Sequence, residues 1–236
     1  MSQTDVASLG TILGVWAHPD DETYLSAGLM TQAIRNGQRV VCVTATKGEA
    51  GSQDEERWPL ARLAAIREAE LMESLRILGV TEHHWLDYPD GGCDKVPGNE
   101  GTAKVAALIE AVQPNTVLTF GPDGQTGHPD HIAVCDWTTA AVQQSGSAAQ
   151  LYYSTVTPEW WAGPGTVLDQ HDVWFAGRPS ITEPDDLAIN FAPDPELMEL
   201  KYQAISAQES QSAGLLAAIG KDFFMQFGGE ETYRNP

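Results

Sequence analysis

The chain has 236 residues, 42% of them hydrophobic, and its 33 acidic side chains outnumber 13 basic ones, for a formal charge of −20. This acidity disfavours nucleic acid and anionic membranes as partners. The sequence contains no run of about 18 apolar residues, so it predicts no membrane span. The first residues lack the pattern of a secretory signal. Three scattered cysteines predict no disulfide framework and fit a reducing, cytoplasmic location.

The first strand-to-helix turn is rich in metal-binding side chains. An apolar run over residues 11–16 predicts a buried strand, and apolar residues at helical spacing predict a helix that ends near Gly37. Between them lies His18-Pro19-Asp20-Asp21-Glu22. In open α/β sheets this turn is at the ligand-binding edge. No Gly-rich phosphate loop is present, so a nucleotide cofactor is disfavoured, whereas an imidazole beside carboxylates suits a divalent cation. The alternative, that the acids only cap the helix, leaves His18 unexplained.

Strands and helices then alternate along the chain. Strands are predicted at 39–46, 85–86 and 116–120, and helices at 59–78 and around 105–112, where Pro114 stops the last one. Such alternation predicts an α/β fold, a Rossmann-like three-layer sandwich with a mostly parallel central sheet. Later segments predict strands at 151–156, near 172–175 and near 187–191, and a helix at 195–208. Because no flexible linker occurs, we expect one domain over 1–236, with a core at 1–150 and a C-terminal elaboration at 151–236.

A second polar turn follows the fourth predicted strand. It reads His128-Pro129-Asp130-His131, with Pro129 suited to the first helical position. Residues three apart at the start of a helix can face one side, so the two histidines complement His18 and Asp21. Together these side chains offer enough donors for a three-ligand zinc site. The alternative is that each histidine is an ordinary core or surface residue, which is the interpretation we give to His83, His84 and His171.

The paired turns resemble the PIG-L/LmbE-like superfamily of zinc-dependent N-acetylglucosaminyl de-N-acetylases, and the resemblance extends through residues 46–49, 67–71 and 86–91. It implies a hydrolase that removes the N-acetyl group from a small amino-sugar substrate with zinc, or another divalent transition metal, and an activated water. The implied roles are metal ligands for His18, Asp21 and His131, general base for Asp20, oxyanion stabilisation by protonated His128, and substrate contact for Arg67.

The residue chemistry agrees with these implied roles. Adjacent acids do not easily place both carboxylates on one ion, so Asp21 can hold the metal while Asp20 faces the water. Asp130 is expected to orient His128 or a ligand histidine from behind.

Two departures from the family pattern limit the inference. Thr126 stands where some members of the superfamily have a tyrosine, and Gln208 stands where many have a histidine. The alternatives are a metal-dependent hydrolase of another amide or ester and a catalytically silent sugar-binding relative. The sequence does not identify the aglycone. It also leaves the oligomeric state open, with a homo-oligomer as one alternative.

Overall fold

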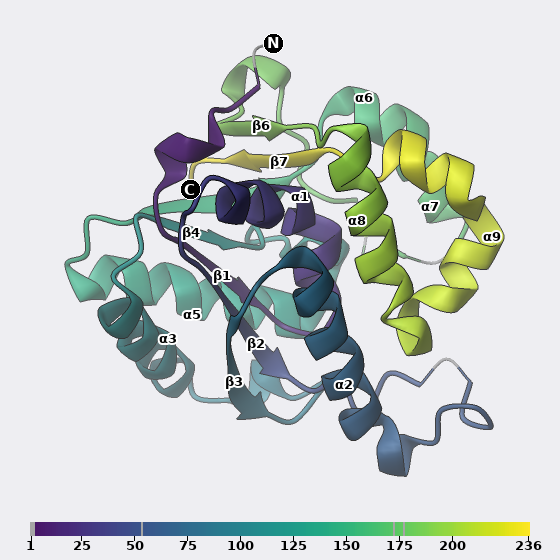
Figure 1. Cartoon of the computed structure of the whole chain (residues 1–236). Helices are drawn as coiled ribbons and strands as arrows, with labels where there is room; N and C mark the ends of the chain where they lie inside the picture. The colour runs from purple at the N-terminus through teal and green to yellow at the C-terminus, as the bar shows by residue number, and fades with distance from the viewer. Residues whose placement is uncertain (1–2, 53, 172, 177) are drawn as a thin grey trace.

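A seven-stranded sheet organises the part of the chain that the computed structural model describes, residues 3–52, 54–171, 173–176 and 178–236 (Figure 1). The strand order is β3-β2-β1-β4-β5-β7-β6. All neighbours from β3 to β5 are parallel, and β7 runs antiparallel to both β5 and β6. The predicted α/β fold with a mostly parallel sheet is confirmed. The strands are β1 (Ile12–Trp16), β2 (Val40–Thr46), β3 (Glu82–Tyr88), β4 (Thr116–Thr119), β5 (Gln150–Thr155), β6 (Ile189–Phe191) and β7 (Glu231–Arg234).

Helices cover both faces of the sheet. Right-handed crossovers place α1 and α2 on one face and α3 and α5 on the other, and α8 packs beside α1 and α2 (Figure 1). No helix among the described residues is long and apolar enough to cross a bilayer. The longer helices are α1 (Asp21–Arg35), α2 (Leu60–Leu78), α3 (Gly98–Val112), α5 (Pro129–Ser145), α8 (Pro195–Ser206) and α9 (Glu209–Phe227).

The strand order reverses between β1 and β4, which lie side by side at the centre of the sheet. Every residue of both strands is buried, as their apolar runs require. Ile12 pairs with Thr116 and Gly14 with Leu118, so the two strands end at the same edge. Open α/β sheets bind ligands at this reversal, beyond the carboxyl ends of the strands. Both polar turns identified in the sequence therefore meet there.

Two expectations about the strands need correction, and two elements were not predicted. The third strand spans Glu82–Tyr88 rather than 85–86, because as an edge strand it is only partly buried and lacks a continuous apolar run. Residues 173–175 form no strand, and Asp172 lies outside the described residues. The sequence also did not predict α9 and β7. Strand β7 has the polar sequence Glu231-Thr232-Tyr233-Arg234, which gives no apolar signal although it lies between two strands.

A buried ion pair fastens the C-terminal segment to the middle of α1. Lys201 Nζ lies 2.9 Å from Glu231 Oε1, and both side chains are almost fully buried. Lys201 also donates to the Tyr24 carbonyl, while Glu231 accepts from the backbone N–H groups of Gly28 and Leu29. The pair has hydrogen bonds on both sides, as buried charges require. It fixes the helix that begins with the first polar turn.

Candidate active site

The first polar turn folds around the carboxylate of Asp21, the first residue of α1. Asp21 Oδ2 accepts hydrogen bonds from the backbone N–H groups of His18, at 2.7 Å, and Ala17, at 3.2 Å. Asp20 occupies the N-cap position, but its side chain makes no capping hydrogen bond. Its backbone has φ 111°, a conformation that non-glycine residues rarely adopt and that concentrates at functional sites. The Asp20 carboxylate is therefore not explained by helix capping.

The second polar turn joins β4 to α5. His128 is the N-cap of α5 and Pro129 its first residue, as predicted. The Nδ1 atom of His128 accepts a hydrogen bond from the Asp130 backbone at 3.2 Å. Because Nδ1 accepts, the proton of a neutral His128 lies on Nε2. Burial lowers the pKa of His128 most, and the charge of His18 lowers it further.

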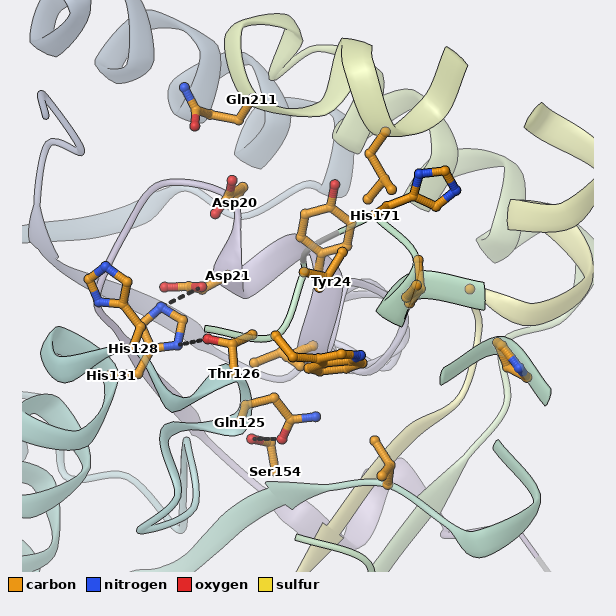
Figure 2. A pocket seen from close by; sticks show the side chains of 18 of the residues that line it. Asp20, Asp21, Tyr24, Gln125, Thr126, His128, His131, Ser154, His171 and Gln211 are labelled. Carbon is orange, nitrogen blue, oxygen red and sulfur yellow. Dashed lines mark hydrogen bonds and ion pairs between the residues drawn. The ribbon is translucent and has the colours of Figure 1, made fainter. Parts of the chain in front are cut away.

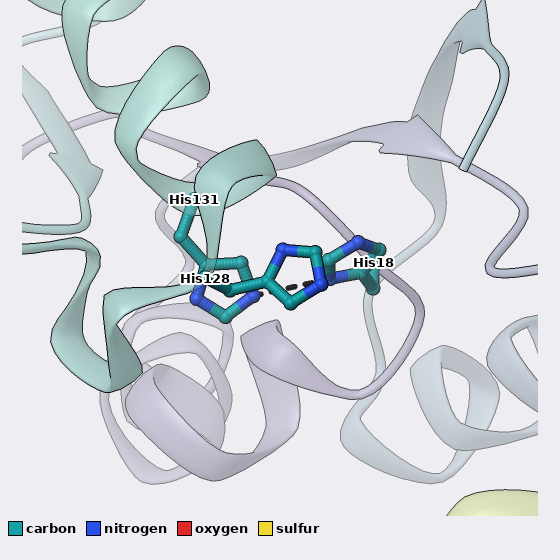
Figure 3. Close-up of side chains that lie close together, drawn as sticks. All are labelled: His18, His128 and His131. Atoms are coloured by element: carbon teal, nitrogen blue, oxygen red, sulfur yellow. Dashed lines mark hydrogen bonds between the residues drawn. The ribbon is translucent and has the colours of Figure 1, made fainter. Parts of the chain in front are cut away.

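Three side chains converge between the two turns. His18 Nδ1 lies 3.1 Å from His131 Nε2, Asp21 Oδ2 lies 3.8 Å from the first nitrogen, and Asp21 Oδ1 lies 3.4 Å from the second (Figure 3 shows the histidines). Neighbouring ligand atoms around a tetrahedral ion with bonds of about 2.05 Å are about 3.3 Å apart. The spacing therefore fits a zinc-class cation. The imidazoles of His18, His128 and His131 also form a group whose nitrogens lie within 4.8 Å of one another.

Hydrogen bonds on the far side of each ring orient the converging nitrogens. His131 Nδ1 lies 2.9 Å from the Gly124 carbonyl, which can only accept, so Nε2 presents its lone pair. Burial lowers the pKa of His131 to about 4, so the ring stays neutral, as a metal ligand must. On the other ring, His18 Nε2 lies 3.1 Å from Asp90 Oδ1 and 3.2 Å from Asp130 Oδ2.

Asp90 and Asp130 make the surroundings of His18 strongly favourable to positive charge. Burial disfavours the charged ring, but the hydrogen bonds to Asp130 and Asp90 and the charge of Asp21 outweigh it and raise the pKa of His18 to about 10. An environment that favours a proton on this ring also favours a cation beside it. Asp130 was predicted to act from behind the ligands, and it contacts His18. Asp90 was missed, although it lies within the stretch 86–91 that carried the family resemblance.

Asp20 and Arg67 lie next to each other at the edge of the converging group. Burial raises the pKa of Asp20 to about 7, against the lowering effect of Arg67. Arg67 is buried and donates to the carbonyls of Pro19, at 2.6 Å, and Gly48, at 2.9 Å. Gly48 has φ 65°, and a Cβ there would overlap the guanidinium. Arg67 thus ties the first polar turn to the loop after β2, and its contact with substrate stays a prediction.

The two departures noted in the sequence have different structural outcomes. Gln208 is buried and donates to Glu22 Oε1 and Thr23 Oγ1, both at 3.0 Å, so it supports the start of α1 from inside the protein. Thr126 Oγ1 lies 3.4 Å from His131 Nδ1 and lines the central cavity. Among the described residues that line this cavity, Tyr24 of α1 is the only phenol.

A cavity of about 620 Å³ opens from these groups. Figure 2 shows Asp21, His128 and His131 on one side of it and His171 on another. His171, which the sequence predicts to be structural or exposed, is exposed and also lines the cavity, and sequence reasoning gave no role to Tyr24, Gln125 or Gln211, which line it as well. Tyr24 and Gln125 lie beside the two polar turns, whereas His171 and Gln211 come from segments that only the tertiary fold brings to the cavity.

Comparison with known proteins gives a consistent result. The family model described as GlcNAc-PI de-N-acetylase, PIG-L, matches residues 13–142. A 1D-myo-inositol 2-acetamido-2-deoxy-alpha-D-glucopyranoside deacetylase of Mycobacterium sp. (strain JLS) is 30% identical over 94% of this chain and 82% of its own length. The N,N'-diacetylchitobiose deacetylase of Pyrococcus horikoshii has a similar structure, with a TM-score of 0.64 and 24% identity over 95% of this chain and 82% of its own. A deacetylase of teicoplanin biosynthesis, solved with teicoplanin, has a TM-score of 0.69 and 18% identity over 95% of this chain and 97% of its own. At these identities the two structures show a shared fold.

Proposed function

The chain belongs to the PIG-L family of GlcNAc-PI de-N-acetylases, and we propose that it is a metal-dependent hydrolase that removes the acetyl group from an N-acetylated glucosaminide. The observation that carries the proposal is the convergence of His18 Nδ1, His131 Nε2 and the Asp21 carboxylate beside a second acid, Asp20. Zinc as the native ion, a small amino-sugar substrate and a cytoplasmic location belong to the same proposal. The last of these is supported by three free, buried cysteines.

His18, Asp21 and His131 would hold the ion, with Asp130 and Asp90 behind His18. When bound, a zinc-class ion polarises a carbonyl and lowers the pKa of a bound water to about 7. The carboxylates behind a ligand histidine fix its orientation and raise its basicity. A cation site with this support fits hydrolysis of an amide better than sugar binding alone, which needs no metal ligands.

Asp20 is the proposed general base. Its carboxylate lines the cavity, and its pKa of about 7 lies near the pH at which proton transfer is most effective. Asp20 would take the proton from the attacking water and deliver a proton to the amine as it leaves. The buried Arg67 beside it, 3.5 Å away, limits how far burial raises this pKa.

His128 is the proposed donor to the oxyanion. A protonated ring was expected, but burial lowers the pKa of His128. A neutral His128 suffices, because its Nδ1 accepts from the Asp130 backbone and its proton therefore lies on Nε2. A preorganised N–H aimed at developing negative charge stabilises the transition state without added reorganisation.

The activity itself is tested by amine release. We expect the purified protein to release a primary amine and acetate from at least one member of a panel of N-acetylglucosaminides, and to lose this activity on chelation. Fluorescent amine detection with and without chelator, followed by addition of zinc, measures both effects. Full activity in a preparation shown to be free of metal would contradict the proposal.

Arg67→Ala is expected to lower both stability and kcat/KM. The substitution leaves the buried Pro19 carbonyl without its donor, at about 1–3 kcal/mol, removes one of the two donors to the Gly48 carbonyl, and loosens the turn that carries Asp20. Urea unfolding and steady-state kinetics measure the two effects. Arg76→Ala is the matched control, since Arg76 lies on the same helix in an exposed pair with Glu73 and should change stability by less than about 0.5 kcal/mol. An Arg67→Ala protein of normal stability with only a raised KM would instead identify Arg67 as a substrate clamp.

A further inference from the structure

The cavity is larger than an N-acetylated hexosamine. Its volume is about 620 Å³. An N-acetylated hexosamine has roughly fifteen non-hydrogen atoms. At about 30 Å³ for each atom, which is the share of liquid volume that a water molecule takes, the sugar would fill about 450 Å³. Space therefore remains for a further part of the substrate, and the side chains around that space indicate its chemistry.

One wall of the remaining space is aromatic. It comes from α6 (Pro158–Trp160), a single wide turn at Trp161–Gly165 and α7 (Thr166–Asp169). Trp174 packs against Trp160 and Trp161, with ring centroids 6.2 and 5.4 Å apart. Trp160, Trp174 and Leu168 line the cavity. Because the rings support one another, this wall is preformed.

A second wall is one side of α9. Leu215, Ala218 and Ile219 line the cavity at the spacing i, i+3, i+4 that places side chains on one helix face. The adjacent Leu216 does not line the cavity and packs against an apolar cluster of Met198, Ile205 and Phe224, which Ile219 also contacts and of which Phe224 lines the cavity too. Helix α9 thus presents an apolar side to the cavity, while Leu216 is used for packing alone.

Charge in the cavity away from the proposed metal site disfavours an anionic occupant. Among the described residues that line the cavity, the acids are Asp20, Asp21, Asp90, Glu230 and Glu231, of which Glu231 is paired with Lys201. Arg67 is the only lysine or arginine among those described residues; its two terminal nitrogens donate to backbone carbonyls and one lies 3.5 Å from Asp20, so only its buried Nε has no partner. A phosphate group needs arginine, lysine or free backbone N–H donors. The cavity therefore disfavours a phosphorylated substrate.

We propose that the amino-sugar substrate carries an uncharged, apolar substituent, alkyl or aromatic, that lies between the wall of Trp160, Leu168 and Trp174 and the wall of Leu215, Ala218 and Ile219. This inference rests on the proposed de-N-acetylase function. Two positions of the substituent share this chemistry, the aglycone and an N-acyl chain longer than acetyl. Burial of each methylene group against such apolar walls is favourable, whereas the acidic residues repel anions.

Two series of probes test the proposal and separate the two positions. In the first, methyl, butyl and octyl glycosides of N-acetylglucosamine vary the aglycone. In the second, methyl glucosaminides bearing N-acetyl, N-butanoyl and N-octanoyl groups vary the acyl chain. We expect kcat/KM for amine release to rise at least about tenfold along one series, as burial of two methylene groups would produce. A 6-phosphorylated methyl glycoside should react more slowly than its parent.

Matched leucine variants test whether the two apolar walls cause any such preference for longer chains. Leu215→Gln and Leu168→Gln, one on each wall, should each reduce the ratio of kcat/KM between the longest and shortest probe of the responding series by about fivefold or more. Leu216→Gln, one residue away on α9 but outside the cavity, should keep the ratio of the unchanged protein. Ratios near one in both series, or preference for the phosphorylated probe, would overturn the proposal.

A binding measurement distinguishes failure of this inference from failure of the proposed function. Tryptophan fluorescence reports binding of the octyl probes, since Trp160 and Trp174 line the cavity. If no compound releases amine, the de-N-acetylase function fails, but tighter binding of octyl than methyl probes still supports the apolar site. If amine is released and neither binding nor kcat/KM depends on chain length, the apolar site is wrong and the function stands.

Discussion

Asp20→Asn is expected to lower kcat by about 10²–10⁴-fold while leaving bound metal and melting temperature nearly unchanged, because the amide has the shape of the acid but cannot accept the proton of the attacking water. Asparagine is the right replacement here. Asp20 has φ 111°, and asparagine tolerates positive φ better than alanine, so backbone strain does not confuse the result. Single-turnover kinetics, metal analysis and thermal unfolding on one preparation measure the three quantities.

An exposed aspartate provides the control for the Asp20 variant. Asp136→Asn on α5 makes the same chemical change outside the cavity and should keep kcat, metal and stability. If Asp20 only capped α1, its replacement would cost about 1 kcal/mol of stability and little activity. The missing cap hydrogen bond already argues against that outcome. Normal turnover by Asp20→Asn would show that another group is the base.

The core of the candidate site was predictable because it depends on local order and on one rule of topology. Each polar turn follows a buried strand, and parallel strands place their carboxyl ends at one edge. The position of Pro129 at the start of α5 likewise follows from its fixed φ and missing N–H. The sequence could therefore bring the pair His128 and His131 to His18 and Asp21 without coordinates, while the choice of His131 as the ligand came from the family resemblance; the structure has His18, Asp21 and His131 close to one another.

The parts that the sequence did not predict depend on long-range contacts. Asp90 reaches His18 only because β3 and the loop after it lie at the same edge of the sheet. The Lys201–Glu231 pair joins residues on α8 and β7 to the middle of α1, and no periodicity marks such a contact. Likewise, Leu215 and Leu216 are indistinguishable by composition, yet one lines the cavity and the other packs against α8. Tertiary packing decided each of these roles.

His131→Ala and Asp21→Asn are expected to lose metal first and activity as a consequence. Each change removes one of three converging donors, and we expect metal affinity to fall by more than the about 10- to 100-fold typical for loss of an outer partner. Excess zinc should then restore part of the activity, in contrast to Asp20→Asn, which no metal concentration should rescue. Competition with a chromogenic chelator measures the affinity, and amine release across a zinc titration measures the rescue.

The two ligand variants should differ in stability, and that difference tests the site in a second way. Asp21 Oδ2 also accepts hydrogen bonds from the backbone N–H groups of Ala17 and His18, whereas His131 Nδ1 is hydrogen-bonded to one backbone carbonyl, that of Gly124. Asp21→Asn therefore weakens charge-assisted bonds within the turn and should lower the melting temperature even without metal. His171→Ala is the control for the histidine, because His171 lines the cavity away from the converging group and should retain full metal affinity. Wild-type metal affinity in both ligand variants would mean that the ion is held elsewhere, and the group of His18, Asp90 and Asp130, which contains neither varied residue, would then be tested with Asp90→Asn.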